Sequence, residues 1–207
     1  MKRILTSMMV FLILIGFSVT AGATSIAVTG FNGLWASYSY NGSTGSLAGE
    51  ILLNIDNKST IGYCVDLDHD VYLGSTYNIS SLSNLSTSSI SKISNAAYLM
   101  ANSNAATTNQ YAALQLAIWE TEYGNSFLYT PTDLLNVNSV GYWYEQYLAL
   151  NNNSYSGSDY KLAMLANGKP IGQNLLVKDT APVPEPATLL LIGSGLLGLA
   201  AFRRKAK

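Results

Sequence analysis

Residues 49–67 read GEILLNIDNKSTIGYCVDL, with one run of strand-forming residues before the turn signal Asp56-Asn57 and another after it. The runs are 49–55 and 61–67, and the second contains the one cysteine of the chain. Three similar runs are predicted as strands at 25–29, 34–40 and 71–72, with further turn signals at Asn32-Gly33 and Asn41-Gly42. This spacing of short strands and turns predicts an antiparallel sheet or barrel.

The centre of the chain has helical spacing instead. One face of a first helix is marked by Ile90, Ile93, Ala97 and Met100. Asn109 is placed to cap a second helix that runs to about Glu122, and a third helix is predicted over 140–150.

The remaining segments complete the expected fold. The Ser-, Thr- and Asn-rich segment 75–94 is predicted as a surface loop that runs into the first helix. Residues 160–165 and 174–178 are candidate closing strands. The sequence therefore predicts an α+β fold, a single compact domain in which an antiparallel sheet or barrel carries a helical central portion.

The N-terminus has the pattern of a secretory signal peptide. Met1-Lys2-Arg3 is basic, residues 4–19 are mostly apolar, and Ala21-Gly22-Ala23 is a small-residue exit. We therefore expect residues 1–23 to be removed, so that the exported protein begins at Thr24.

The C-terminus has three parts in a fixed order. Pro184-Glu185-Pro186 comes first, a short apolar span predicted to cross the membrane follows over 187–202, and Arg203-Arg204-Lys205 ends it. This order resembles the PEP-CTERM sorting signal, which an exosortase recognises in Gram-negative bacteria. The resemblance implies a precursor held transiently at the inner membrane, cleavage near the motif, and passage to the cell surface or the extracellular matrix. The exported domain is then 24–180 and the sorting tail 181–207.

The composition restricts the partners of that domain. The net charge is −1 and only 11% of residues are charged, so nucleic acid is not expected as a partner. Fourteen Tyr and three Trp suit contact with polysaccharide, although Tyr is also common in half-buried strands. Neither a cofactor nor a metal ion is expected.

Cys64 cannot form a disulfide within the chain, because it is the one cysteine. In an exported protein a free thiol is exposed to oxidation unless it is buried, used, or bonded to something other than sulfur. Gln115 poses a related question, because helical spacing surrounds it with Tyr111, Ile118 and Trp119. An unpaired buried amide costs about 1–3 kcal/mol, so this one needs partners or is consumed by acyl transfer.

Two motifs resemble those of the thioester domains of bacterial surface adhesins. The first is the aromatic-cysteine pair Tyr63-Cys64, and the second is the segment 114–119, LQLAIW, which has the form hydrophobe-Gln-x-x-hydrophobe-Trp. In that family the cysteine sulfur attacks the glutamine amide, ammonia leaves, and an internal thioester remains. The resemblance implies a bond between Cys64 and Gln115, with surroundings formed by Tyr63, Asp66, Tyr111, Ile118 and Trp119.

The implied function is a covalent clamp that is used once and is not an enzyme. An amine or a hydroxyl on another surface or on a polysaccharide would open the thioester and become attached through Gln115, giving adhesion or matrix cross-linking. The alternative is a non-covalent exopolysaccharide or biofilm matrix protein in which Cys64 is a buried, inert thiol.

Two other groupings around the cysteine need interpretation. Asp66, Asp68 and Asp70 alternate like the start of a calcium loop, but the sixth and twelfth positions exclude an EF-hand, which leaves looser calcium binding or a solvated acidic face. Cys64 and His69 would be the pair of a cysteine hydrolase. Their spacing of five residues rarely gives the required hydrogen bond, so His69 is interpreted as a turn residue.

Overall fold

Two antiparallel hairpins begin the fold in the computed structural model, which describes residues 26–55, 57–81, 87–150, 159–165 and 173–178. Strand β1 (Ile26–Tyr40) pairs with β2 (Ser43–Ile55), and β2 pairs with β3 (Lys58–Cys64). The first turn, Asn41-Gly42, has φ angles of 48° and 80°. Positive φ at both central residues is what a tight two-residue hairpin requires, so this predicted turn is confirmed.

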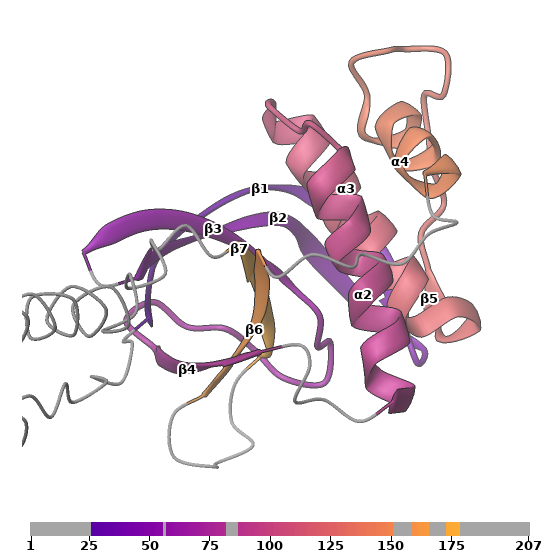
Figure 1. Ribbon diagram of the computed structural model, residues 1–207. Helices are drawn as coiled ribbons and strands as arrows, with labels where there is room; N and C mark the ends of the chain where they lie inside the picture. Colours follow the sequence, from indigo (N-terminus) through magenta and orange to yellow (C-terminus); the bar gives the residue numbers. More distant parts are fainter. Residues whose placement is uncertain (1–25, 56, 82–86, 151–158, 166–172, 179–207) are drawn as a thin grey trace, which may run out of the picture.

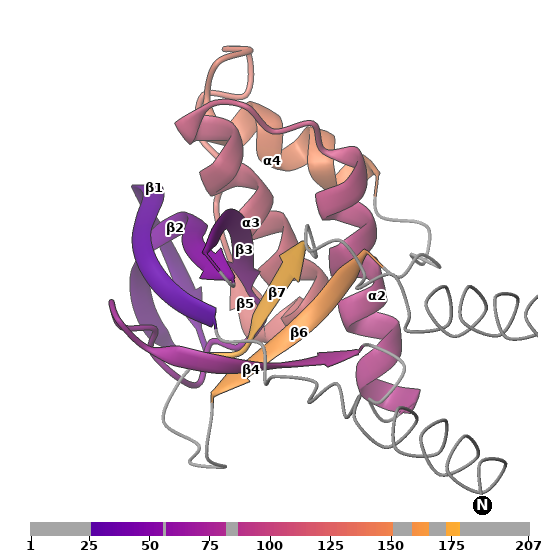
Figure 2. The ribbon, with the colours of Figure 1, turned by 60° about the vertical axis from the view of Figure 1, so that its left-hand side comes forward.

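The strands of the described residues form one antiparallel sheet that closes on itself. Its order is β2-β3-β7-β6-β4-β1-β5, and β1 pairs with β2 as well, which joins the two sides into a barrel. The other strands are β4 (Thr76–Ser81), β5 (Phe127–Leu128), β6 (Tyr160–Leu165) and β7 (Leu175–Lys178). The predicted closing strands are thus confirmed, and the last one, β7, lies between β3 and β6 (Figure 2).

The helices gather at one side of the barrel (Figure 1). They are α2 (Thr87–Asn102), α3 (Thr108–Tyr123), the short 3₁₀ helix η2 (Gly124–Ser126) and α4 (Val140–Ala149). Every residue of α3 from 112 to 119 is buried, because the helix packs against β1 and β2 as well as against α2 and α4. The predicted α+β fold is confirmed, and α3 is its central helix.

Three predictions for residues 64–94 were wrong. The segment 75–94, predicted as a loop, contains strand β4, which pairs with β6 and β1 through backbone hydrogen bonds that do not depend on its polar side chains. Residues 71–72 form no strand, and β3 ends at Cys64 instead of Leu67. Residues 65–75, between β3 and β4, form neither helix nor strand.

Asn32-Gly33 is not a turn but lies inside β1, which joins the two predicted runs into one strand. The glycine is needed for close approach: a Cβ on Gly33 would lie 2.5 Å from the carbonyl oxygen of Ala48, and Gly49 is the cross-strand partner. Asn32 donates a hydrogen bond to Glu50 at 3.0 Å across the same pairing.

The cap of α3 is Thr107 and not Asn109. Thr107 accepts from the backbone N–H of Gln110, and the side chain of Gln110 accepts from the backbone N–H of Thr107, which is a complete capping box. Asn109, the second residue of the helix, donates instead to the carbonyl oxygen of Asn138.

The two sorting segments lie outside the described residues. These are the signal peptide, 1–23, and the tail 181–207 with Pro184-Glu185-Pro186 and the apolar span 187–202. Among the helices that the structure does describe, none is long and apolar enough to cross a membrane.

Candidate functional site

Cys64 is the last residue of β3, and its side chain is buried. The pairing of β3 with β2 stops at Gly62, and the end of the strand is held by β7, where Cys64 pairs with Leu175. Burial raises the pKa of the Cys64 thiol well above its usual value, and the negative charge of Asp66 raises it further. The sulfur is therefore a protonated thiol at neutral pH.

Gln115 lies in the middle of α3 and is 1% exposed. Its side-chain amide makes two hydrogen bonds to the backbone of one residue: Cys64 N–H donates to Gln115 Oε1 at 2.8 Å, and Gln115 Nε2 donates to the Cys64 carbonyl at 2.8 Å. The fold therefore brings the two predicted residues together, although 51 positions separate them in sequence. The buried amide is satisfied at the point where β3 ends.

Gln173 is a third member of the site that the sequence did not suggest. The Cys64 thiol donates to Gln173 Oε1 at 2.6 Å, and the Gln173 backbone N–H donates to the carbonyl of Asp70 at 3.0 Å. No local pattern marks Gln173, since it lies just before β7 and reaches Cys64 only through the pairing of β7 with β3. Its side chain is buried beside the thiol.

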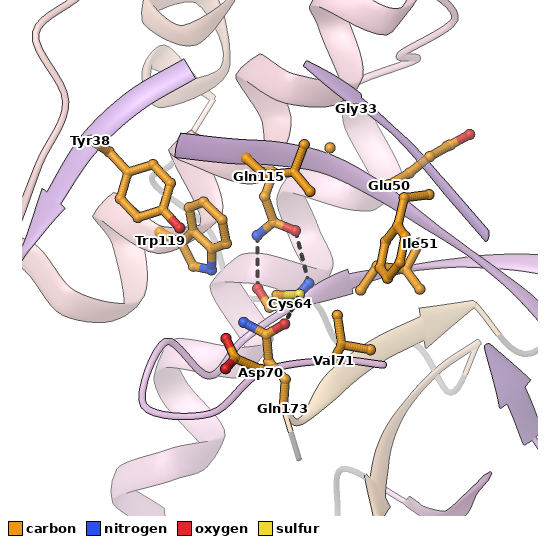
Figure 3. A pocket seen from close by; sticks show the side chains of 13 residues that line it. Gly33, Tyr38, Glu50, Ile51, Cys64, Asp70, Val71, Gln115, Trp119 and Gln173 are labelled. Atoms are coloured by element: carbon orange, nitrogen blue, oxygen red, sulfur yellow. Dashed lines mark hydrogen bonds between the residues drawn. The ribbon is translucent and has the colours of Figure 1, made fainter. Parts of the chain in front are cut away.

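A pocket of about 250 Å³ opens onto this group. Figure 3 shows Tyr38 and Trp119 on one side of the cysteine and glutamine, with Glu50 on the other side and Asp70 beside Gln173. The full lining comprises Phe31, Gly33, Tyr38, Leu47, Gly49, Glu50, Ile51, Cys64, Asp70, Val71, Gln115, Trp119 and Gln173. The pocket thus joins the buried pair to the surface and has carboxylates in its wall.

The walls of the pocket are aromatic on the side of α3. The rings of Tyr38 and Trp119 lie 4.8 Å apart between centroids, and burial raises the pKa of Tyr38 to about 12, with the negative charge of Asp70 acting in the same direction. Trp119 Nε1 is buried and has no hydrogen-bond partner among the described residues. Across the pocket, burial raises the pKa of Glu50, while the hydrogen bond from Asn32 lowers it.

The other predicted surroundings of the pair are divided between the pocket and the core. Trp119 lines the pocket, whereas Tyr63, Tyr111 and Ile118 do not. Tyr63 and Ile118 are core residues, 1% and 0% exposed, and Tyr111 is partly buried. Tyr63 precedes Cys64 in a strand, so its side chain points to the opposite face.

Asp66 organises the segment that follows β3. Its carboxylate accepts from the backbone N–H of Asp68 at 3.0 Å, from the side chain of Asn174 at 3.1 Å, and contacts His69 Nδ1 at 2.8 Å. The three acidic residues are not in a strand, and they share no face, since Asp66 is buried while Asp68 and Asp70 are exposed. Within the described ranges, no group of His, Cys, Asp or Glu side chains could hold a metal ion.

His69 is a residue of the bend after β3, with Asp66 as its partner. The Cys64 thiol contacts Gln173 instead. The geometry therefore gives no support to a cysteine–histidine hydrolase pair.

Comparison with known proteins places a sorting signal at the end of the chain. The family model of the PEP-CTERM protein-sorting motif matches residues 182–205, which confirms that prediction. The motif implies an exported protein of a Gram-negative bacterium with a membrane-anchored precursor that an exosortase processes. No curated protein matches the chain.

A solved structure is similar to the domain at low identity. It is the N-terminal thioester domain of fibronectin-binding protein SfbI from Streptococcus pyogenes, with a TM-score of 0.40 and 16% identity. The match covers 72% of this chain and 95% of that chain. A similarity at this level does not by itself assign an activity.

Proposed function

We propose that Cys64 and Gln115 form an internal thioester, and that the exported domain uses it once to attach itself covalently to another surface. The observation that carries this proposal is the pair of 2.8 Å hydrogen bonds that hold the Gln115 amide against the backbone of Cys64. These bonds keep the Gln115 side-chain amide, the acyl donor, beside Cys64, whose thiol is the nucleophile. The motifs Tyr63-Cys64 and 114–119 point to the same two residues.

The hydrogen-bond pattern suits the formation of the thioester. Cys64 N–H donates to Gln115 Oε1, the oxygen that becomes negative when sulfur attacks the side-chain carbonyl carbon. The S–C bond forms, the C–N bond breaks, and ammonia leaves with the thiol proton, so no further reactant is needed. The protonated thiol is a weak nucleophile, but oriented intramolecular attack corresponds to effective molarities of about 10⁵–10⁸ M.

The pocket gives a second nucleophile access to the same carbonyl carbon. With an amine, an N–C bond forms, the C–S bond breaks, and the amine proton goes to sulfur, which frees the Cys64 thiol. With a hydroxyl the product is an ester. Each thioester is consumed once, so the protein is a clamp and not an enzyme.

The sorting motif supports a place of action outside the cell. We infer that the exosortase product reaches the cell surface or the extracellular matrix, where amines and hydroxyls of other surfaces and of polysaccharides are plentiful. The partner is then an amine- or hydroxyl-bearing surface or polysaccharide, and the function is adhesion or matrix cross-linking.

A second candidate function is a non-covalent matrix protein with an inert Cys64. It is favoured by the raised pKa of the thiol and by the hydrogen bonds at both polar atoms of the Gln115 amide, which together describe a stable buried contact. The two candidate functions predict different masses for the chain, because only thioester formation removes one ammonia from it.

The deciding experiment is intact-mass analysis of the full chain, before and after incubation with methylamine. The thioester form is lighter than the encoded chain by one ammonia, and methylamine adds its mass at Gln115 while one thiol becomes titratable. Cys64→Ala and Gln115→Glu should abolish both changes, because the first removes the sulfur and a carboxylate is a poor acyl donor at neutral pH.

Gln146→Glu is the matched control. It makes the same chemical change at an exposed position of α4, and it should behave like the wild type. If the wild type has the full encoded mass, takes up no amine and shows the same free thiol as Gln115→Glu, the covalent function is wrong and the matrix protein remains.

A further inference from the structure

A second pocket, of about 540 Å³, lies apart from Cys64. It is bounded by residues 35–37 of β1, by Asn109 in the first turn of α3, and by residues of the segment 129–141, which leads into α4. It shares no lining residue with the pocket at Cys64. The residues that line it therefore need an explanation separate from the thioester.

Trp35 is the most unusual residue of this pocket. Its side chain is 81% exposed, although the next residue along β1, Ala36, is buried. A large aromatic ring left in water has lost the stabilisation that burial would give it, about 25 cal/mol per Å² of apolar surface. On a surface with few charged residues, such a ring provides a flat apolar platform for a ligand.

The opposite wall is rigid because the segment before α4 is hydrogen-bonded to itself. Ser139 Oγ donates to the Asp133 carbonyl at 2.7 Å, Asn136 donates to the Asp133 carboxylate at 2.8 Å, and the Asn138 N–H donates to Asn136 at 3.0 Å. Gly141 anchors the segment on α4, since a Cβ there would lie 2.1 Å from the Thr132 carbonyl oxygen. The wall is therefore formed before any ligand arrives, which reduces the entropy lost on binding.

This wall presents neutral hydrogen-bonding groups to the pocket. Thr130, Thr132 and Asn138 belong to this wall, and Ser37 lines the pocket from β1; no hydrogen bond of these four side chains occurs within the described ranges. Asp133 is the one charged residue of the lining, and its carboxylate already accepts from Asn136. Hydroxyls and an amide can both donate and accept, so they suit a neutral ligand that is rich in hydroxyls.

We propose that this second pocket binds a neutral polysaccharide, with a sugar ring lying against Trp35. A sugar ring has an apolar C–H face for the indole and equatorial hydroxyls for the groups of the opposite wall, which an ionic ligand or a simple hydrocarbon does not combine. Binding here does not require the thioester. Trp35 lies opposite Leu47 in the β1–β2 pairing, and Leu47 lines the pocket at Cys64, so the two pockets adjoin along these strands.

The test is native affinity electrophoresis of the full chain, in a zwitterionic detergent without a sugar headgroup, through gels containing hydroxyethylcellulose, dextran or galactomannan. At least one of these neutral polymers should retard the wild type. Trp35→Ala should weaken retardation at least tenfold, whereas Trp35→Phe, which keeps a ring face, should retain most of it. Far-ultraviolet circular dichroism checks that each variant is folded.

Two exposed residues outside the pocket provide matched controls. Leu135→Ala alters the same segment at a side chain that is 98% exposed, and Tyr72→Ala removes an exposed aromatic ring elsewhere. Both should bind like the wild type, and so should Cys64→Ala, which separates this site from the thioester. A further gel contains alginate, an acidic polysaccharide. The proposal would be overturned by retardation in none of the neutral polymers, by retardation in alginate alone, or by an unchanged affinity of Trp35→Ala.

Discussion

The thiol of Cys64 donates a hydrogen bond of 2.6 Å to the side-chain oxygen of Gln173, a residue 109 positions further along the chain. An amide oxygen accepts a hydrogen bond without taking the proton at neutral pH, so this contact orients the S–H group and does not ionise it. The direction of the sulfur is thus fixed by Gln173, just before β7, whereas the Gln115 amide is fixed by the backbone of Cys64 in β3.

Replacing Gln173 should slow the formation of the thioester. In Gln173→Ala the thiol loses its acceptor, and the loss of one hydrogen bond of about 1 kcal/mol corresponds to about fivefold in rate. The measurement is the fraction of chains lacking one ammonia, followed by mass spectrometry after refolding. Asn174→Ala is the control, because it removes a bond to Asp66 and leaves the thiol contact in place. Equal rates in the two variants would contradict an orienting role.

A methyl group at Gly33 should destabilise the barrel. In Gly33→Ala the new Cβ meets the backbone of Ala48, and backbone cannot move aside without disturbing the β1–β2 pairing. We expect the free energy of unfolding to fall by about 1–3 kcal/mol in urea denaturation. In Gly30→Ala, on the same strand, the nearest atom is a Leu52 methyl at 3.4 Å, so stability should change little. Similar losses in both variants would exclude the close approach as the cause.

Stability should decrease with rising pH because of Glu122. Burial raises its pKa in the folded protein to about 7, while the charge of Lys92 acts in the opposite direction. The folded state therefore holds the proton more tightly than the unfolded state, and this contribution is present below about pH 4.5 and lost as pH rises through about 7.

The difference is measured by urea denaturation at pH 5 and pH 8. Relative to Glu122→Gln, which cannot ionise, the wild type should lose on the order of 1–3 kcal/mol between these values. Glu145→Gln, at an exposed position of α4, should keep the wild-type dependence. An unchanged pH dependence in Glu122→Gln would assign the effect to another group.

Processing should depend on the sorting motif. In cells that have an exosortase, the wild-type protein should lose the apolar tail, whereas replacing Pro184-Glu185-Pro186 by three alanines should leave a full-length tail in the membrane fraction. Mass spectrometry of the released and membrane fractions measures both. Pro170→Ala, outside the matched residues 182–205, should be processed normally. Release of the triple variant at the wild-type mass would mean that the motif is not the cleavage signal.

The local parts of the fold could be predicted from the sequence. The Asn41-Gly42 turn and the helices of the centre depend on neighbouring residues, and both were found where they were expected. Strand β4 was missed because its sequence, TYNISS, is polar apart from Tyr77 and Ile79, and its pairing with β6 is determined by distant residues. The turn predicted at Asn32-Gly33 was wrong because the sequence does not distinguish a glycine that permits close approach of two strands from a glycine that adopts a turn conformation.

The candidate site was predictable only where a motif marks it. Cys64 and Gln115 were selected by motif and by chemistry, and the fold brings them into hydrogen-bond contact. Gln173 belongs to no motif, and it reaches the pocket because β7 lies between β3 and β6. Asp70 was noted only as part of an acidic series, and its carbonyl accepts the backbone N–H of Gln173. A sequence has no local signal for a contact of that kind.

The position of β7 has a consequence for the time at which the domain becomes reactive. The last strand in sequence completes the middle of the barrel, so β3 has an open edge until almost the whole domain has emerged from the export channel. Closing so long a loop is among the slowest steps of folding. If the proposed thioester forms with the help of Gln173, its formation is postponed until translocation is nearly finished, and the half-exported chain would then be unable to attach itself to the export machinery.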